Sequence, residues 1–168
     1  NNLKDRSAGL VVRNNWIESG NRQLDLVDAE DSDVIVNDPS YGETFVYGNV
    51  LIEPEGAGNS QILHYGGDSG NTAIYRKGIL HFFHNTVVSL RPGNTTLMRL
   101  STDDESADLR NNVLLVTASG DRLAIVDGSG YADLSHNWMK PGWVDTHGTL
   151  TGDVADDGSQ IEAADPLF

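Results

Sequence analysis

One short pattern recurs five times along the 168-residue chain and constrains its fold more than any other feature. It consists of an apolar residue, two further positions, an asparagine, one more position and a second apolar residue. The asparagines are Asn15, Asn49, Asn85, Asn112 and Asn137. Their separations of 34, 36, 27 and 25 residues are typical of a solenoid whose turns carry loops of different length. The pattern therefore predicts a stack of coils.

Each asparagine of the pattern stands between residues that we expect to face a core. Asparagine tolerates the left-handed backbone conformation better than other non-glycine residues, so it suits a sharp bend between two short strands. If successive coils bend at the same place, their amides can hydrogen-bond from coil to coil, which avoids the cost of burying unpaired polar groups. We therefore expect an internal asparagine ladder.

A second strand is expected about ten residues after each asparagine, because short apolar runs bounded by Gly, Asn, Asp and Ser are typical of strands. No apolar spacing of three and four residues persists beyond two turns, so we expect no helix. The chain is thus predicted to be one all-β domain, residues 1–168, of about six coils. The copies of the second strand are Leu24–Val27, Ile62–Tyr65, Leu97–Leu100 and Leu123–Val126, with a weaker last copy near Leu150.

Three segments carry a resemblance to a known family: Phe82–Val87, Leu109–Leu114 and the closing Ala164–Phe168. With the repeated asparagine bend, they resemble bacterial right-handed parallel β-helix proteins of the pectate-lyase-like superfamily. The resemblance covers nearly the whole chain and implies a right-handed β-helix solenoid and a secreted or periplasmic location. Lyases, hydrolases, epimerases and non-enzymatic adhesins share this fold, so the reaction has to be inferred from a site.

Composition excludes several classes of function. The chain has no cysteine, so neither disulfides nor thiolate metal sites are available. Its formal net charge of −14 would repel nucleic acid. No apolar run is long enough to cross a membrane. Composition therefore argues against nucleic acid and membrane as partners, and the resemblance implies a polysaccharide.

The two ends of the chain suggest a fragment. The sequence begins at Asn1 without methionine or signal peptide, and neither end has an obvious cap for the open strand edges of a β-helix. We expect the later coils of a longer protein, with end-to-end self-association through uncapped coils. The longest loops are expected on the early coils, around residues 29–43 and 66–78, and insertions in solenoids commonly mark the binding face.

The first candidate site is a basic group in the opening coil, and its members are Lys4, Arg6, Arg13 and Arg22. A polysaccharide lyase removes the proton next to a uronate carboxylate, so it needs a base and positive charge that stabilises the resulting anion. Lys4 or Arg22 is the candidate base, if its neighbours lower its pKa, and Arg6 the group that neutralises the carboxylate. The alternative is that these residues are solvated partners of nearby carboxylates.

The second candidate site is acidic. Asp25 and Asp28 begin a stretch that continues into the first long loop, and oxygen ligands from strand and loop could hold Ca²⁺. The resemblance implies the same ion, since pectate-lyase-like enzymes often use Ca²⁺ to bridge protein and substrate carboxylate. Asp31-x-Asp33 fails the EF-hand pattern, because Val-Ile-Val follows it. A solvated acidic loop is the alternative.

Histidines supply the third candidate site. If the second strands align, His64, Tyr65 and Arg99 share a groove with Asp25, where His64 is a candidate acid or base and Tyr65 and Arg99 would bind substrate. His81 and His84 are three apart on a strand, so they are expected to face opposite sides. A hydrogen-bonded, partly buried His64 is the alternative.

Two function classes follow. The chain lacks the Arg-x-Pro-x-x-Arg segment of pectate lyases and the Gly-His-Gly and paired-Asp signatures of polygalacturonases. The arrangement of a Lys and an Arg near one groove resembles that of alginate and chondroitin lyases built on this fold. The first class is a polysaccharide lyase acting on an acidic glycan. The second is a non-catalytic glycan-binding or structural module whose strand face offers aromatic rings for sugar stacking. The enzyme class requires that one groove be faced by Lys4, Arg22, Asp25 and His64. The aromatic rings available to the binding module are Tyr47, Tyr65, Phe83 and Trp138.

Overall fold

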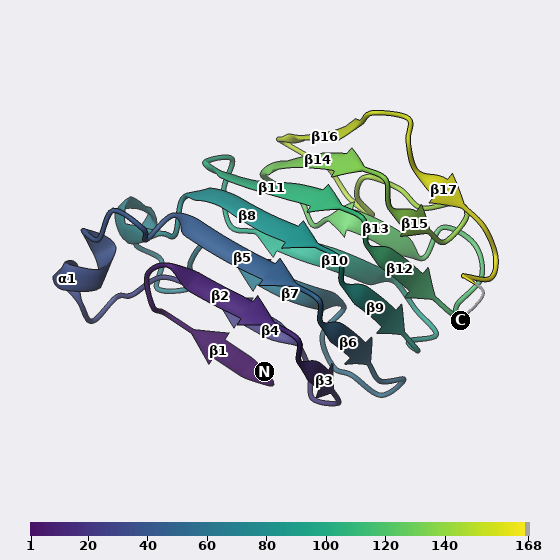
Figure 1. The fold of residues 1–168 in the computed structure, drawn as a ribbon, viewed down its shortest axis with the longest axis horizontal. Coiled ribbons are helices and arrows are strands. Elements are labelled where there is room, and N and C mark those ends of the chain that lie inside the picture. Colours follow the sequence, from purple (N-terminus) through teal and green to yellow (C-terminus); the bar gives the residue numbers. More distant parts are fainter. Residues whose placement is uncertain (167–168) are drawn as a thin grey trace.

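The computed structural model describes residues 1–166, which form three parallel sheets stacked around a common core (Figure 1). Sheet A contains β1 (Leu3–Asp5), β4 (Leu24–Leu26), β7 (Gln61–Tyr65), β10 (Thr95–Leu100) and β13 (Leu123–Val126). Sheet B contains β2 (Leu10–Arg13), β5 (Glu43–Tyr47), β8 (Gly78–Phe83), β11 (Glu105–Arg110), β14 (Tyr131–Ser135) and β16 (Asp153–Asp156). Sheet C contains β3 (Trp16–Glu18), β6 (Val50–Glu53), β9 (Thr86–Ser89), β12 (Val113–Val116), β15 (Trp138–Met139) and β17 (Ile161–Glu162).

The chain visits the sheets in a fixed order. Each coil passes from sheet B through the asparagine bend to sheet C and then to sheet A, and every strand pairs in parallel with the equivalent strand of the next coil. This is a parallel β-helix, so the predicted all-β solenoid is confirmed. Residues 167 and 168, which close the Ala164–Phe168 segment, lie outside the described residues.

The core is built from rows of apolar side chains in register. One such row crosses sheet B, and each of its members is at most 3% exposed. Burying a large aliphatic or aromatic side chain stabilises the fold by about 1.5 to 3 kcal/mol, so each row contributes substantially. The members of this row are Val12, Val46, Phe82, Leu109 and Leu134.

The asparagine ladder is present inside the bend between sheets B and C. Each Nδ2 donates to the Oδ1 of the next asparagine, at 3.0 Å from Asn15 to Asn49, 3.0 Å from Asn49 to Asn85, 3.3 Å from Asn85 to Asn112 and 2.9 Å from Asn112 to Asn137. The sequence pattern missed a sixth rung, because Asn137 donates to the side-chain oxygen of Gln160 at 3.0 Å.

The position of the left-handed residue differs from the prediction. Positive φ occurs one residue before each ladder asparagine and not at the asparagine itself. Because the backbone turns there, the following amide is directed inward to its neighbours. The left-handed residues are Asn14 (φ 56°), Gly48 (φ 65°), His84 (φ 54°), Asn111 (φ 55°) and His136 (φ 54°).

The last copy of the second strand is also displaced. Val144, and not the region of Leu150, continues sheet A through an isolated bridge to Ala124. Leu150 is partly buried against the core without belonging to a strand. Between Met139 and Asp153 the sheet A strand of the final coil is reduced to this single bridge.

Both long loops lie where the spacing predicts, between sheets A and B. Each contains one helical turn, α1 (Asp33–Val36) in the first and η1 (Thr72–Ile74) in the second, so the expectation of no helix was wrong. Side chains cap both turns: Ser32 accepts a hydrogen bond from the N–H of Ile35, and Asn71 accepts one from the N–H of Ala73. Among residues 1–166, no helix has the length and apolar character needed to span a bilayer.

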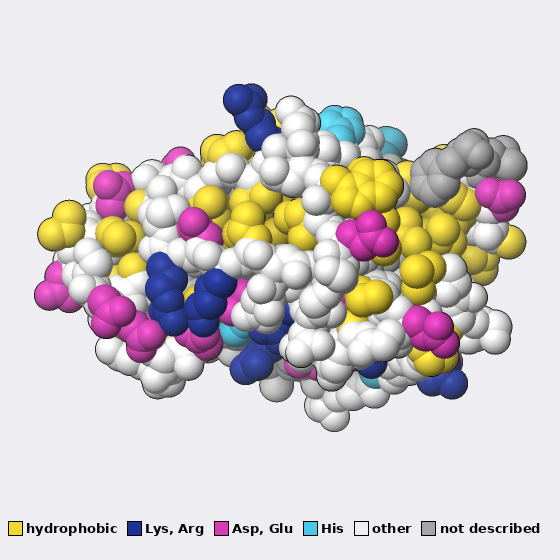
Figure 2. Space-filling view, turned by 90° about the horizontal axis from the view of Figure 1, so that it is seen from below, with side chains coloured by type: hydrophobic (Ala, Val, Ile, Leu, Met, Phe, Trp, Pro, Cys, Tyr) yellow, Lys and Arg dark blue, Asp and Glu magenta, His cyan; other side chains and the backbone are white. Residues whose placement is uncertain are grey.

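The view toward the first coil shows a band of hydrophobic side chains at the N-terminal end of the solenoid, with Lys and Arg side chains beside Asp and Glu side chains along one edge (Figure 2). Leu3, Leu10 and Ile17 are partly buried against the core, and Trp16 is 68% exposed. A shallow hollow on this end reaches the first rung of the ladder, Asn15.

Candidate functional site

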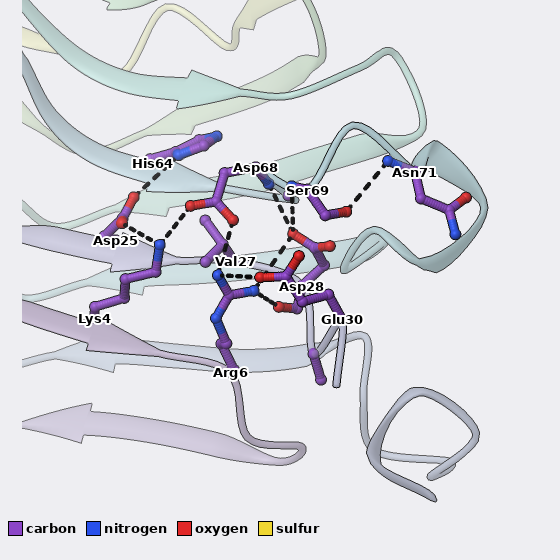
Figure 3. A network of polar contacts seen from close by, with 12 residues as sticks. Lys4, Arg6, Asp25, Val27, Asp28, Glu30, His64, Asp68, Ser69 and Asn71 are labelled. Carbon is purple, nitrogen blue, oxygen red and sulfur yellow. Dashed lines mark hydrogen bonds and ion pairs between the residues drawn. The ribbon is translucent and has the colours of Figure 1, made fainter. Parts of the chain in front are cut away.

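Charged side chains form a row across the outer face of sheet A (Figure 3). Lys4 pairs in register with Asp25, Asp25 with His64, and His64 with Arg99. Side chains alternate along a strand, so Asp25 points away from the core that its neighbours Leu24 and Leu26 enter. Four consecutive coils therefore bring the predicted charged residues to one face.

Asp25 is the centre of this row and is almost fully buried. One carboxylate oxygen contacts Arg22 Nη1 at 3.0 Å and His64 Nδ1 at 3.1 Å. The other contacts Lys4 Nζ at 3.4 Å and accepts a hydrogen bond from Asn1 Nδ2 at 2.6 Å. Burial alone would raise the pKa of Asp25, but the hydrogen bond with His64 and the charges of Arg22 and Lys4 lower it well below its ordinary value.

Lys4 and Arg6 together hold a carboxylate from the second long loop. Asp68 accepts a hydrogen bond from Lys4 Nζ through Oδ2, and its Oδ1 lies 3.1 Å from Arg6 Nη2. All three side chains are accessible, with exposed fractions of 39% for Lys4, 29% for Arg6 and 34% for Asp68. The two cations thus bridge one carboxylate at the protein surface.

The environment of Lys4 does not fit the predicted role of a base. Its hydrogen bond with Asp68, reinforced by the charges of Asp68 and Asp25, raises the pKa of Lys4 in spite of partial burial. A base has to give up its proton, and a raised pKa opposes this. Arg22, the alternative base, is only 8% exposed and is held by Asp25, His64 and Gln61, so it lacks access to a substrate.

Asp28 lies beneath the second long loop and is fully buried. Its Oδ1 accepts hydrogen bonds from the N–H of Asp68 at 2.7 Å and of Ser69 at 3.4 Å. Burial would raise the pKa of Asp28, but hydrogen bonds from the side chain of Ser69 and from these backbone groups lower it below its ordinary value. Arg6 donates to the carbonyl oxygen of Asp28 and contacts Glu30 at 3.0 Å.

The site does not fit the predicted Ca²⁺. The carboxylates of Asp25 and Asp28 are engaged by separate partners, and Lys4, Arg22 and Arg6 stand beside them. Within residues 1–166, no group of three or more His, Cys, Asp or Glu side chains is arranged to hold a metal ion. A calcium ion needs six to eight oxygen ligands, whereas here cationic side chains stand next to the oxygens.

His64 is 2% exposed and is held from both sides. Its Nδ1 faces Asp25, and its Nε2 lies 2.9 Å from the hydroxyl oxygen of Ser101. Sequence reasoning missed Ser101. The available signal was its position two residues after Arg99, which places both on the same face if the strand continues.

The remaining predicted residues lie elsewhere. Tyr65 points into the core, 0% exposed, donates its hydroxyl to the carbonyl of Gly42 at 3.3 Å and has its pKa raised to about 12 by burial. The substrate-binding prediction for Tyr65 was therefore wrong. Tyr47 lies on sheet B, stacked on Phe83 at 4.9 Å. This stack covers one face of each ring, and the guanidinium of Arg110 lies over the Phe83 ring, 5.2 Å from its centroid. Trp138 is on sheet C.

The two other histidines do not join the row on sheet A. His81 stacks on Phe45 at 4.8 Å and contacts Asp108 at 3.3 Å on sheet B. His84 has the left-handed conformation at the asparagine bend. Neither contributes to the charged row.

Comparison with known proteins gives no relative: no family model, no curated protein sequence and no solved structure matches this chain. The class defined by the fold is the parallel β-helix.

Proposed function

We propose that this protein binds an acidic glycan across the outer face of sheet A, with Lys4 and Arg6 holding a sugar carboxylate. The observation that carries this proposal is the bridge from the two cations to Asp68. A uronate carboxylate has the same charge and the same two acceptor oxygens as the Asp68 side chain. It can replace Asp68 between Lys4 and Arg6 without a new arrangement of either cation.

The rest of the face supports binding of a chain and not only of a single sugar. Arg99 is exposed three coils from Lys4 in the same register row, so it can meet a second acidic sugar. The strands of neighbouring coils are separated by about 4.8 Å, which gives a periodic surface for a periodic ligand. The overall charge of −14 opposes a polyanion, so binding depends on these local cations and should weaken as salt increases.

A lyase that cleaves by β-elimination is the second candidate function. It is supported by the convergence of Lys4, Arg22, Asp25 and His64 on one face, which this activity requires. Lys4 and Arg6 would then neutralise the uronate carboxylate and stabilise the anion formed at the neighbouring carbon. Arg22 and His64 are both enclosed, at 8% and 2% exposed, so this candidate function is left without an accessible base among the residues predicted for it.

The Lys4→Ala variant tests the binding site. We expect it to reduce affinity for oligogalacturonate by about tenfold, because an accessible charge-assisted contact is worth about 1.4 kcal/mol. Titration calorimetry at low salt measures the change. Lys77→Ala is the matched control, since Lys77 is 41% exposed and pairs with Asp104 at 2.6 Å on another part of the surface. Equal affinities of the two variants would contradict the proposed site.

Incubation of the protein with acidic glycans, followed by ultraviolet absorbance, separates binding from cleavage. A lyase produces unsaturated uronates, which absorb in the near ultraviolet, whereas a binding module leaves the absorbance constant. Polygalacturonate, alginate and chondroitin represent three classes of acidic glycan. Chelator should not change the outcome, because the site does not fit Ca²⁺.

A further inference from the structure

We infer that Asp25, His64 and Ser101 form a nucleophilic triad that hydrolyses an ester carried by the bound glycan, with Ser101 Oγ as the nucleophile. The three side chains come from successive coils: Asp25 from β4, His64 from β7 and Ser101 from the residue that follows β10. The inference rests on the proposed function only for the nature of the substrate. The geometry of the triad stands independently of it.

The hydrogen bonds run in the order that the chemistry requires. Asp25 Oδ1 lies 3.1 Å from His64 Nδ1, so the carboxylate can hold the proton on that nitrogen. With the proton on Nδ1, His64 Nε2 can accept the Ser101 hydroxyl proton across 2.9 Å, and the carbonyl oxygens of Tyr65 at 3.2 Å and Gly67 at 3.0 Å are the other acceptors of this hydroxyl. Arg22 Nη1 donates to Asp25 Oδ1 at 3.0 Å and so fixes the carboxylate in place. A Ser-His-Asp arrangement of this kind is recognised by geometry and not by fold or sequence order.

Burial is graded along the triad. Asp25 and His64 are each 2% exposed, whereas Ser101 is half-buried and so is the member that can meet a ligand. The glycan face defined by Lys4 and Arg99 contains the same row as Asp25 and His64. An ester on a sugar bound across this face would therefore approach Ser101.

Two glycines shape the space around the hydroxyl. The N–H of Gly67 donates to Ser101 Oγ at 2.9 Å and so fixes the position of the hydroxyl. At Gly66, with φ +125°, a Cβ would lie only 2.6 Å from Ser101 Oγ. A side chain at this position would displace the hydroxyl, so glycine keeps the nucleophile in reach of His64.

The reaction balances with water as the only co-reactant. Ser101 Oγ forms a bond to the ester carbonyl carbon while its proton moves to His64 Nε2. The bond between that carbon and the sugar oxygen then breaks, and the sugar oxygen takes the proton from His64. Water, activated by His64 in the same way, releases the acyl group from Ser101 as a carboxylic acid and restores the hydroxyl.

A fluorophosphonate probe tests the nucleophile without knowledge of the natural ester. We expect the probe to add covalently to Ser101, as located by peptide mass spectrometry, and Ser101→Ala to abolish the addition. Ser129→Ala is the matched control, because Ser129 is the equivalent half-buried hydroxyl near the next coil and donates to the carbonyl of Leu100 at 2.7 Å. It should be labelled like the wild type.

Absence of label on Ser101 in folded wild-type protein would overturn the triad. Labelling that persists in Ser101→Ala would overturn it as well. Circular dichroism melts of both variants establish that each is folded. Binding of oligogalacturonate to Ser101→Ala is measured in parallel, so that loss of the nucleophile and failure of the glycan site give different results.

Discussion

Replacement of Asn112 by alanine is expected to lower the free energy of unfolding by about 3 to 5 kcal/mol, because several buried hydrogen bonds are lost at once. Asn112 is 1% exposed. Its Nδ2 donates to the carbonyl of Phe82 and to Asn137 Oδ1, both at 2.9 Å. Its Oδ1 accepts from the backbone N–H of Asn85 at 2.9 Å and from Asn85 Nδ2 at 3.3 Å. Alanine removes all four bonds and leaves the buried backbone N–H of Asn85 without this acceptor.

The matched control for the ladder is Asn15→Ala. Asn15 stands at the first rung, is exposed, and donates to Asn49 Oδ1 at 3.0 Å. Its loss should cost about 1 kcal/mol, since water can replace the missing group. Urea denaturation of both variants measures the difference. Equal destabilisation by the two substitutions would contradict an energetic role for burial of the ladder.

Glu53→Gln is expected to remove most of a pH dependence of stability. Glu53 faces the interior at the end of β6 and is 0% exposed. Gln23 Nε2 donates to its Oε2 at 2.6 Å, while Oε1 has no partner among the described residues. Burial raises the pKa of Glu53 from 4.5 to about 7, although Gln23, Arg91 and Arg22 oppose this. The folded state therefore binds the proton more tightly than the unfolded chain does.

The sign of the effect follows from proton linkage. The contribution of Glu53 to stability is greatest below pH 4.5, where Glu53 is protonated in both states, falls as pH rises, and levels off above about pH 7. A shift of this size corresponds to about 3 kcal/mol. Glutamine keeps the shape and the hydrogen bond but carries no charge, so it should be more stable than the wild type at pH 8 and similar at pH 4.5.

Urea denaturation at both pH values measures this difference. Glu55→Gln, two residues away and exposed, is the control and should keep the wild-type dependence of unfolding free energy on pH. If the unfolding free energy of Glu53→Gln changes with pH as in the wild type, Glu53 does not cause the pH dependence.

The fold was predictable because its signal is periodic. The spacing of the asparagines indicates the coils, and the same spacing brings Lys4, Asp25, His64 and Arg99 into one row. Tyr65 was misplaced because adjacent residues of a strand face opposite sides. If His64 points outward, its neighbour points into the core.

Residues outside the repeat could not be found in this way. Asp68 lies in a loop whose path depends on hydrogen bonds to the buried carboxylate of Asp28, a contact between residues 40 positions apart. Gln160 takes the place of an asparagine in the ladder, so a search for asparagine misses it. A lowered pKa was expected for Lys4, but the hydrogen bond with Asp68 raises it. This could not be predicted either, because Asp68 lies outside the repeat.

The affinity of Asp68→Asn for oligogalacturonate tests the proposed glycan site most directly. Asparagine removes the charge that competes for Lys4 and Arg6, so both cations become available to a sugar carboxylate. Calorimetry at low salt should show an affinity several-fold above the wild type, with the gain lost in the Lys4→Ala/Asp68→Asn double variant. An affinity that is unchanged or lower in Asp68→Asn would contradict the assignment of Lys4 and Arg6 as the carboxylate-binding pair.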